Sequence, residues 1–162
     1  MRIFNFAWII ILLIASGCVS VSLSGDKPVP ASGVALEAPP APFKKAKNST
    51  DASWLSERTG NSIAYVSACD SKTEVPLEQL ESSALASLDK TDMSSSSAVL
   101  FQGRAARTNT ASGTLDGIPM RMSILVFKKN NCDYTLIYGG VAKQFDSELQ
   151  YFENFKRNFK VP

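Results

Sequence analysis

The sequence predicts an α+β fold in which an antiparallel β-sheet is covered by two helices. Residues 62–68, 98–102, 105–115, 120–127 and 132–138 are rich in strand-forming residues, and turn residues separate them. Two other segments, one beginning at Pro76 and one over residues 146–159, repeat apolar residues at helical spacing. With a short extended segment at Trp54-Leu55, the order becomes β-β-α-β-β-β-β-α, which is typical of an α+β sandwich.

Turn signals divide the strand-rich part of the chain into hairpins. Asp116-Gly117 is the strongest of these signals, because both central positions of a type I′ turn require positive φ. Gly103 marks a turn or bulge, and Lys129-Asn130-Asn131 predicts another turn. Residues 92–97 interrupt the strand pattern, so we expect an exposed loop there.

Each predicted helix has one apolar face. The first begins at Pro76, where the missing N–H costs little, and its apolar face comprises Leu77, Leu80, Ala84, Leu85 and Leu88. The second carries a largely aromatic stripe formed by Leu149, Phe152, Phe155 and Phe159. Such a stripe belongs to a helix that faces a core, so we expect the second helix to pack across the sheet.

Four features of this region resemble domains of the PsbP/Mog1 type. They are the strand 98–102 followed by Gly103-Arg104, the Asp116-Gly117 hairpin, the run Tyr134-Thr135-Leu136-Ile137-Tyr138, and the closing Phe152, Phe155 and Phe159 before Lys160-Val161. The resemblance covers residues 54–162 in pattern. It implies a PsbP/Mog1-like sandwich and a non-enzymatic role, since members of that fold class generally assist assemblies or bind proteins.

The first 17 residues have the three-part pattern of a secretory signal peptide. Arg2 supplies a short positive start, residues 7–14 form an uninterrupted apolar run, and the small residues Ala15, Ser16 and Gly17 follow. The apolar run is shorter than the roughly 20 residues that a transmembrane helix needs. We therefore expect residues 1–17 to be removed during export.

The segment Ala15-Ser16-Gly17-Cys18 resembles the lipobox of bacterial lipoproteins, whose cysteine receives diacylglycerol before cleavage in front of it. The resemblance implies a lipoprotein whose acyl chains, palmitate among them, hold Cys18 at a bilayer. Ala15 stands where the common lipobox has Leu, and ordinary signal peptidase cleavage stays open because Ala15 and Gly17 also satisfy its small-residue rule. Val19 after the cysteine, by the sorting rules of Gram-negative lipoproteins, implies the periplasmic face of the outer membrane.

Composition divides the chain into a signal peptide over 1–17, a lipidated linker over 18–52 and a globular domain over 53–162. The linker is rich in Ser, Pro, Gly and Ala and has no sustained period, so we expect it to be flexible and partly polyproline-like. Lys44, Lys45 and Lys47 form a basic cluster at its end. They could contact anionic lipid or cell-wall polymer, but a solvated linker end is the simpler interpretation.

With Cys18 lipidated, Cys69 and Cys132 remain as a pair at the ends of two predicted strands. The cell envelope permits oxidation, so we expect a disulfide. Closing a loop of about 64 residues would stabilise the fold by about 4 kcal/mol in the chain-entropy model. The alternative is a metal or redox pair, but two thiols without histidine make a poor zinc site and the spacing is not C-x-x-C.

The composition also limits the chemistry. The chain has no histidine, which excludes Ser-His-Asp and Cys-His catalysis and histidine zinc sites. Its 17 Lys+Arg against 15 Asp+Glu, or 16 against 15 without the signal peptide, lack the basic excess of a nucleic-acid-binding protein. We assign no catalytic residue, metal or cofactor. Arg104, Arg107 and Arg121 around the hairpin could bind an acidic glycan or a partner's carboxylate, and a solvated sheet face is the alternative.

These observations predict a non-enzymatic envelope lipoprotein that contacts membrane lipid through Cys18 and an envelope protein through its domain. Two alternatives remain. A histidine-free glycan hydrolase would need two carboxyl groups about 5–10 Å apart in a cleft. A small-molecule carrier would need an apolar cavity of about 300 Å³ or more.

Overall fold

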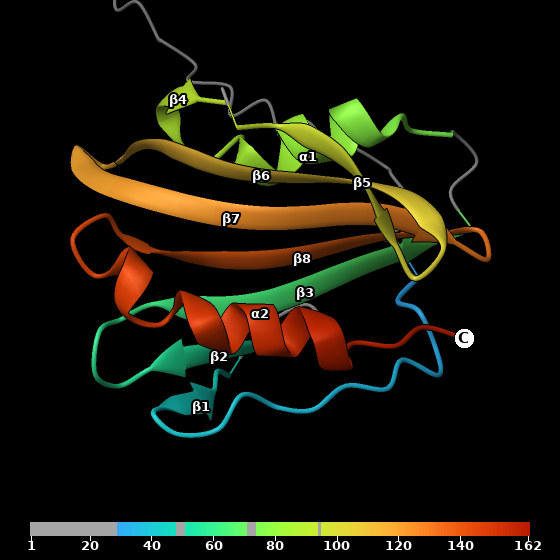
Figure 1. Ribbon diagram of the computed structural model, residues 1–162, viewed down its shortest axis with the longest axis horizontal. Coiled ribbons are helices and arrows are strands. Elements are labelled where there is room, and N and C mark those ends of the chain that lie inside the picture. Colours follow the sequence, from blue (N-terminus) through green and yellow to red (C-terminus); the bar gives the residue numbers. More distant parts are fainter. Residues whose placement is uncertain (1–28, 48–50, 71–73, 94) are drawn as a thin grey trace, which may run out of the picture.

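The structure is a computed structural model and describes residues 29–47, 51–70, 74–93 and 95–162. One antiparallel sheet organises them (Figure 1). Its strands are β1 (Phe43–Lys45), β2 (Ala52–Ser56), β3 (Ser62–Cys69), β4 (Asp89–Asp92), β5 (Ser97–Phe101), β6 (Arg104–Leu115), β7 (Ile118–Lys129) and β8 (Cys132–Val141). They lie in the order β1-β2-β3-β8-β7-β6-β4, and β5 pairs with another part of β6.

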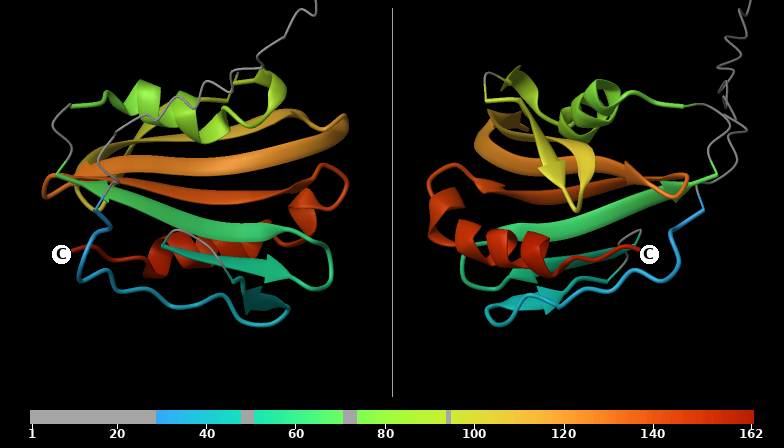
Figure 2. Two further views of the ribbon diagram at one scale, coloured as in Figure 1. Left: turned by 180° about the vertical axis from the view of Figure 1, so that it is seen from behind. Right: turned by 45° about the vertical axis from the view of Figure 1, so that its right-hand side comes forward.

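Two helices cover opposite faces of the sheet (Figure 2). Helix α1 (Leu77–Leu85) lies against β6, β7 and β8 on one face. Helix α2 (Leu149–Asn158), preceded by a 3₁₀ turn η1 (Phe145–Ser147), lies on the other. Alternate residues of β7 therefore enter two separate cores, and residues 124–127 are all buried. The predicted α+β sandwich with two covering helices is confirmed.

The aromatic stripe of α2 forms the centre of the larger core. Phe155 packs edge-on against Trp54 with ring centroids 5.5 Å apart, and Phe152 stacks on Tyr138 at 5.7 Å. Phe159, just after the helix, reaches Phe127 across the sheet. The expectation that this face packs across the sheet is thus confirmed.

Three two-residue turns connect β5 to β8 as successive hairpins. Gln102-Gly103, Asp116-Gly117 and Asn130-Asn131 all have positive φ at both residues, as a type I′ turn requires. The turn predicted at Asp116-Gly117 is therefore present. The turn predicted over 129–131 is one residue shorter, because Lys129 still pairs with Cys132.

Strand β4, which the sequence pattern did not predict, shortens the predicted loop over residues 92–97 at its start. Residues 89–92 pair with β6 through Asp89↔Thr114 and Asp92↔Ser112, and Ser97 already belongs to β5. The sequence Asp-Lys-Thr-Asp has no buried side, so it shows none of the alternation by which strands are recognised.

The predicted flexible linker over 18–52 is wrong for residues 29–47, which are folded onto the domain. Val29 pairs with Cys69, Ala35 pairs with Lys160, and β1 extends the sheet beside β2. Phe43 is only 5% exposed. The apolar residues of this segment enter the larger core one at a time. They follow no helical or strand period, so the sequence pattern did not identify them as core residues. The folded domain therefore begins near Val29 and not at Ser53.

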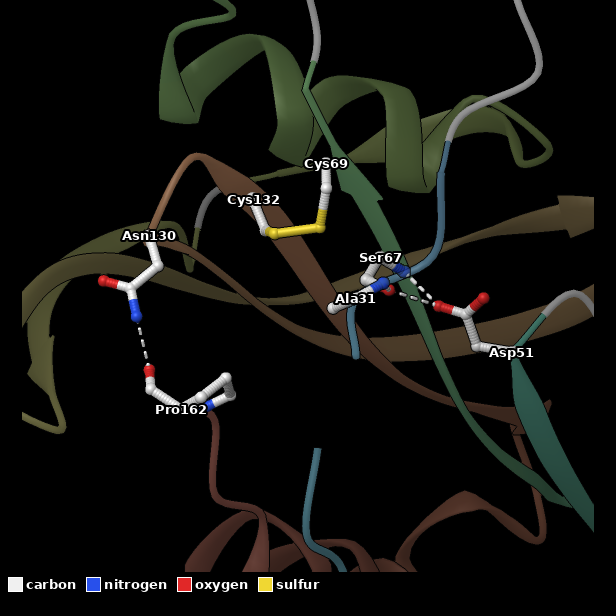
Figure 3. Close-up of a disulfide and its surroundings, with 7 residues drawn as sticks. All are labelled: Ala31, Asp51, Ser67, Cys69, Asn130, Cys132 and Pro162. Atoms are coloured by element: carbon white, nitrogen blue, oxygen red, sulfur yellow. Dashed lines mark hydrogen bonds between the residues drawn. A yellow bond between two sulfur atoms is a disulfide. The ribbon is translucent and has the colours of Figure 1, made fainter. Parts of the chain in front are cut away.

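A disulfide joins Cys69 on β3 to Cys132 on β8, as predicted (Figure 3). The two residues are register partners with Cα atoms 4.0 Å apart. Hydrogen bonds hold both ends of the described chain near this disulfide. The Ala31 N–H donates to Ser67 Oγ at 2.8 Å, and the Asn130 side chain donates to the Pro162 carbonyl at 2.8 Å.

Replacing Phe43 with Ala tests whether the segment before β2 belongs to the domain. We expect the free energy of unfolding to fall by about 3 kcal/mol, because truncating a buried phenylalanine leaves a cavity. Urea denaturation measures the change. Leu115→Ala, at a side chain 41% exposed, is the control and should change stability by less than about 1 kcal/mol. A Phe43→Ala chain as stable as this control would restore the linker interpretation.

Candidate functional site

The three arginines predicted to form one cluster are separated by the sheet. Arg107 on β6 faces α1, whereas Arg121 on β7 faces η1. Arg121 binds Asp146 at 2.8 Å and lies 4.3 Å from the centre of the Phe145 ring. Arg104 is exposed beside the Gln102-Gly103 turn. Register explains the difference, because Arg121 pairs with Ser112 and not with Arg107. The structure therefore offers no common arginine site.

Arg107 instead ties α1 to β6 through the buried carboxylate of Glu81. Its Nε donates to Glu81 Oε2 at 2.5 Å, and its other nitrogens reach Glu78 and Ser96. The Asn109 side chain donates to Glu81 Oε1 at 2.8 Å. Burial alone raises the pKa of Glu81, but the hydrogen bonds from Ser96, Arg107 and Asn109 and the charge of Arg107 outweigh it, so that pKa is lowered.

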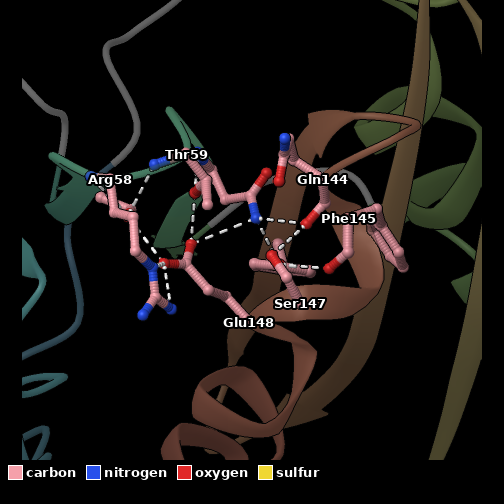
Figure 4. A network of polar contacts seen from close by, with 9 residues as sticks. Arg58, Thr59, Gln144, Phe145, Ser147 and Glu148 are labelled. Atoms are coloured by element: carbon pink, nitrogen blue, oxygen red, sulfur yellow. Dashed lines mark hydrogen bonds and ion pairs between the residues drawn. The ribbon is translucent and has the colours of Figure 1, made fainter.

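A second buried carboxylate, Glu148, ties the start of α2 to the β2–β3 loop (Figure 4). Its oxygens accept hydrogen bonds from Ser56 at 2.9 Å, from Thr59, and from Arg58 Nε at 3.1 Å. Burial raises the pKa of Glu148, and the bonds from Thr59, Ser56 and Arg58 more than offset this, so that pKa is also lowered.

Asn61 extends this network into the sheet. Its side-chain nitrogen donates to Glu148 Oε2, to the Tyr138 hydroxyl at 2.9 Å and to the Gln144 carbonyl at 3.0 Å. Tyr138 in turn donates to the Phe145 carbonyl at 2.6 Å, and burial raises its pKa. A Cβ on Gly140 would lie 1.8 Å from Asn61 Oδ1, so this position accepts glycine alone.

These polar networks join the helices to the sheet and its loops. Their two carboxylates are not arranged as a pair of catalytic acids. Each carboxylate stays ionised because several donors satisfy it, whereas a general acid at neutral pH needs a raised pKa. Glu81 and Glu148 also lie on opposite faces of the sheet. Within the described part of the chain, no group of three or more acidic, cysteine or histidine side chains is placed to hold a metal ion.

The most exposed of the large apolar side chains that the structure describes lies on the edge of β5, beside a groove. The groove has a volume of about 520 Å³ and lies between the start of α1 and the β5–β6 hairpin. Its lining comprises Leu77, Glu78, Ala98, Val99, Leu100, Ala105, Ala106 and Arg107. Leu100 is 81% exposed, more than any other large apolar side chain among the described residues. Open apolar surface beside a strand with one unpaired edge is typical of a protein-binding site.

Sequence reasoning missed these features for different reasons. Glu81 falls on the apolar face of the first helix, four residues after Leu77, so its spacing could have shown that it is buried. Leu100 lies between Val99 and Phe101, which both pack against the core, so its outward position follows from strand alternation. Glu148 precedes its helix and carries no comparable signal.

Replacing Glu148 with Gln tests its network through pH. At pH 7 we expect the free energy of unfolding to fall by about 1.5–3 kcal/mol, because Gln cannot replace the charged hydrogen bonds. The folded pKa of Glu148 is lowered, so its contribution is complete above the unfolded pKa. It is lost as pH falls through the folded pKa. The difference between the two proteins should therefore shrink below about pH 4.5.

The control for this measurement is Glu57→Gln. Glu57 makes an exposed ion pair with Lys44 at 2.7 Å, and such pairs contribute about 0–1 kcal/mol. A difference between wild type and Glu148→Gln that stayed constant from pH 7 to pH 3 would contradict the ionised network.

Comparisons with known proteins place the fold. Neither a family model nor a curated protein sequence matches the chain. The crystal structure of LpqN, involved in cell envelope biogenesis of Mycobacterium tuberculosis, is similar with a TM-score of 0.61 and 12% identity, over 86% of this chain and 88% of that one. The solution structure of cyanobacterial PsbP from Synechocystis is similar with a TM-score of 0.56 and 10% identity, over 91% and 99%.

A protein of unknown function from Pseudomonas aeruginosa is similar as well, with a TM-score of 0.50 and 10% identity, over 74% of this chain and 96% of that one. At these identities the likeness concerns the fold. The chain therefore has the PsbP-like α+β fold that its sequence pattern predicted.

Proposed function

We propose that the chain is an outer-membrane lipoprotein, anchored through Cys18 at the periplasmic face, and that its domain binds protein at the open edge of β5 without catalysing a reaction. The observation that carries the binding role is the exposed, uncharged β5 beside an apolar groove. The likeness to LpqN, which is involved in cell envelope biogenesis, supports an envelope location.

Anchoring rests on the signal pattern, since Cys18 lies outside the described residues. Among the residues that are described, none of the helices has the length and apolar character to cross a bilayer. The folded segment from Val29 shortens the connection to Cys18 to residues 19–28. Ten residues reach at most about 35 Å when fully extended. The disulfide end of the domain, where Val29 pairs with Cys69, would therefore stay close to the bilayer.

A non-catalytic role agrees with how the buried carboxylates are used. A glycan hydrolase needs two carboxyl groups facing one cleft, one of them with a raised pKa. Glu81 and Glu148 lie in separate structural networks and both pKa values are lowered. The other alternative is the small-molecule carrier, which the groove volume of about 520 Å³ favours. The position of this groove beside the unpaired edge of β5 favours a protein segment instead.

Strand addition explains how the site would bind. In this mode an extended segment forms main-chain hydrogen bonds with a sheet edge, and pockets for alternate side chains provide specificity. The edge of β5 supplies the main-chain groups, and the groove between Leu77 and Leu100 supplies an apolar pocket. No charged side chain lies on β5 itself, so we expect the bound segment to be apolar at alternate positions.

The anchor can be tested by mass spectrometry of the amino-terminal peptide from membranes. We expect wild type to begin at Cys18 with added fatty acyl mass. Cys18→Ser should lose that mass and leave the membrane fraction, since Ala15-Ser16-Gly17 still permits ordinary cleavage. Ser20→Ala, which keeps the thiol, should behave as wild type. An unmodified amino end at Cys18 in the wild-type protein would rule the anchor out.

The binding surface can be tested with a photoreactive amino acid at position 100 of the full chain in cells. We expect light-dependent adducts, because Leu100 projects into the groove where the bound segment would lie. Position 55 is the matched control, since Leu55 is also an exposed strand leucine, 49% accessible, but lies on β2 away from the β5 edge. Equal adduct yields at both positions, or none at position 100, would refute binding at this edge.

A further inference from the structure

The three strands that form edges of the sheet differ in charge. At one side β1 ends the sheet with Lys44 and Lys45 on a three-residue strand. At the other side β4 carries Asp89, Lys90 and Asp92. Short edges and charged residues prevent pairing with another chain. By contrast β5, with the sequence Ser-Ala-Val-Leu-Phe, has neither charge nor proline. It is the one unprotected edge among these three.

The backbone of β5 has hydrogen-bonding groups available at this edge. Phe101 and Arg104 close a two-residue type I′ turn, so they form a hydrogen-bonded pair. Because hydrogen-bonded and non-hydrogen-bonded pairs alternate, Val99 also bonds to β6. The N–H and C=O groups of Ala98 and Leu100 then point away from β6. In the described part of the chain, no other strand pairs with β5.

The side chains of β5 are divided in the same way. Val99 and Phe101 pack against the larger core. Ala98 and Leu100 lie on the α1 face, where they line the groove with Leu77. A small residue and a large exposed one thus stand two positions apart on the open edge.

We propose that β5 of a second copy of this chain occupies this edge, in antiparallel orientation about a two-fold axis at Val99. The inference rests on the proposed function, since it names the partner of the same surface. Around that axis Ala98 pairs with Leu100 of the second copy, and Leu100 pairs with Ala98 of the second copy. Both are hydrogen-bonded pairs, so the outward backbone groups of Ala98 and Leu100 satisfy each other across the interface.

Size and charge make this strand complementary to its own copy. Cross-strand partners lie on the same face of a sheet, so each exposed Leu100 would cover the small Ala98 of the other copy and enter its groove. No like charges face each other, because all five residues of β5 are uncharged. The two-fold arrangement is the usual closed form of a homodimer, in which the same patch serves both subunits.

Engineered disulfides test the proposed axis. Val99 would face its own copy in a non-hydrogen-bonded pair, where Cα atoms lie about 4.5 Å apart. That distance suits a cross-strand disulfide. In a full chain carrying Cys18→Ser, we expect Val99→Cys to give mostly covalent dimer in a glutathione redox buffer. Leu115→Cys, exposed at the β6–β7 turn, should stay mostly monomeric. Equal dimer yields from both would overturn the two-fold axis.

A second measurement, of the oligomeric state in solution, does not depend on whether the Val99→Cys chain folds. Light scattering of the Cys18→Ser chain should show a dimer. Adding Leu100→Lys should raise the dissociation constant of this dimer at least tenfold, because each copy would then bring a charged lysine to the apolar interface. Leu55→Lys should leave the dimer intact. A monomer up to about 100 μM, at which the micromolar affinity typical of a weak transient interface would be detected, would overturn the inference.

The crosslinking experiment at position 100 separates this inference from the proposed function. An adduct of twice the chain mass supports the homodimer. An adduct with a different protein alone overturns the homodimer and leaves protein binding at β5 in place. The absence of any adduct overturns both.

Discussion

The fold depends on burying the central strands β7 and β8 on both faces. Leu125, Phe127 and Tyr134 enter the core beneath α2, while Ile124 and Val126 enter the core beneath α1. Burial of apolar surface is the main stabilising contribution in folding, and each helix covers one of the two cores. Residues of the segment 29–47 and residues after α2 also pack into the core beneath α2, which makes that core much the larger of the two.

Ionised side chains fix the two helices in register on this sheet. Arg107 and Glu81 join α1 to β6, and Glu148 joins the start of α2 to the loop before β3. A buried carboxylate is costly unless donors satisfy it, and here each of the two accepts several hydrogen bonds. The same requirement that stabilises the carboxylates removes them from acid–base chemistry. These two buried networks therefore explain how the helices are placed on the sheet.

Local patterns predicted the fold, whereas contacts between distant residues could not be predicted. The hairpin at Asp116-Gly117, the strand alternation and the aromatic stripe of α2 are local signals, and each identified its element. The segment 29–47 was missed because its order comes from pairings such as Val29 with Cys69 and Ala35 with Lys160, more than 35 residues away. The prediction that the three arginines form one cluster was wrong for a related reason, since register decides which face a strand residue occupies.

The unprotected edge shows why the proposed binding surface was harder to predict than the fold. A sequence shows that Ser-Ala-Val-Leu-Phe forms a strand, but only the topology shows that this strand lies at an edge. Natural proteins protect such edges, and in this chain β1 and β4 are protected by charge. An apolar edge that remains beside two protected ones carries a risk of aggregation unless it is paired. The simplest physical reason to keep it is that a strand from another chain covers it.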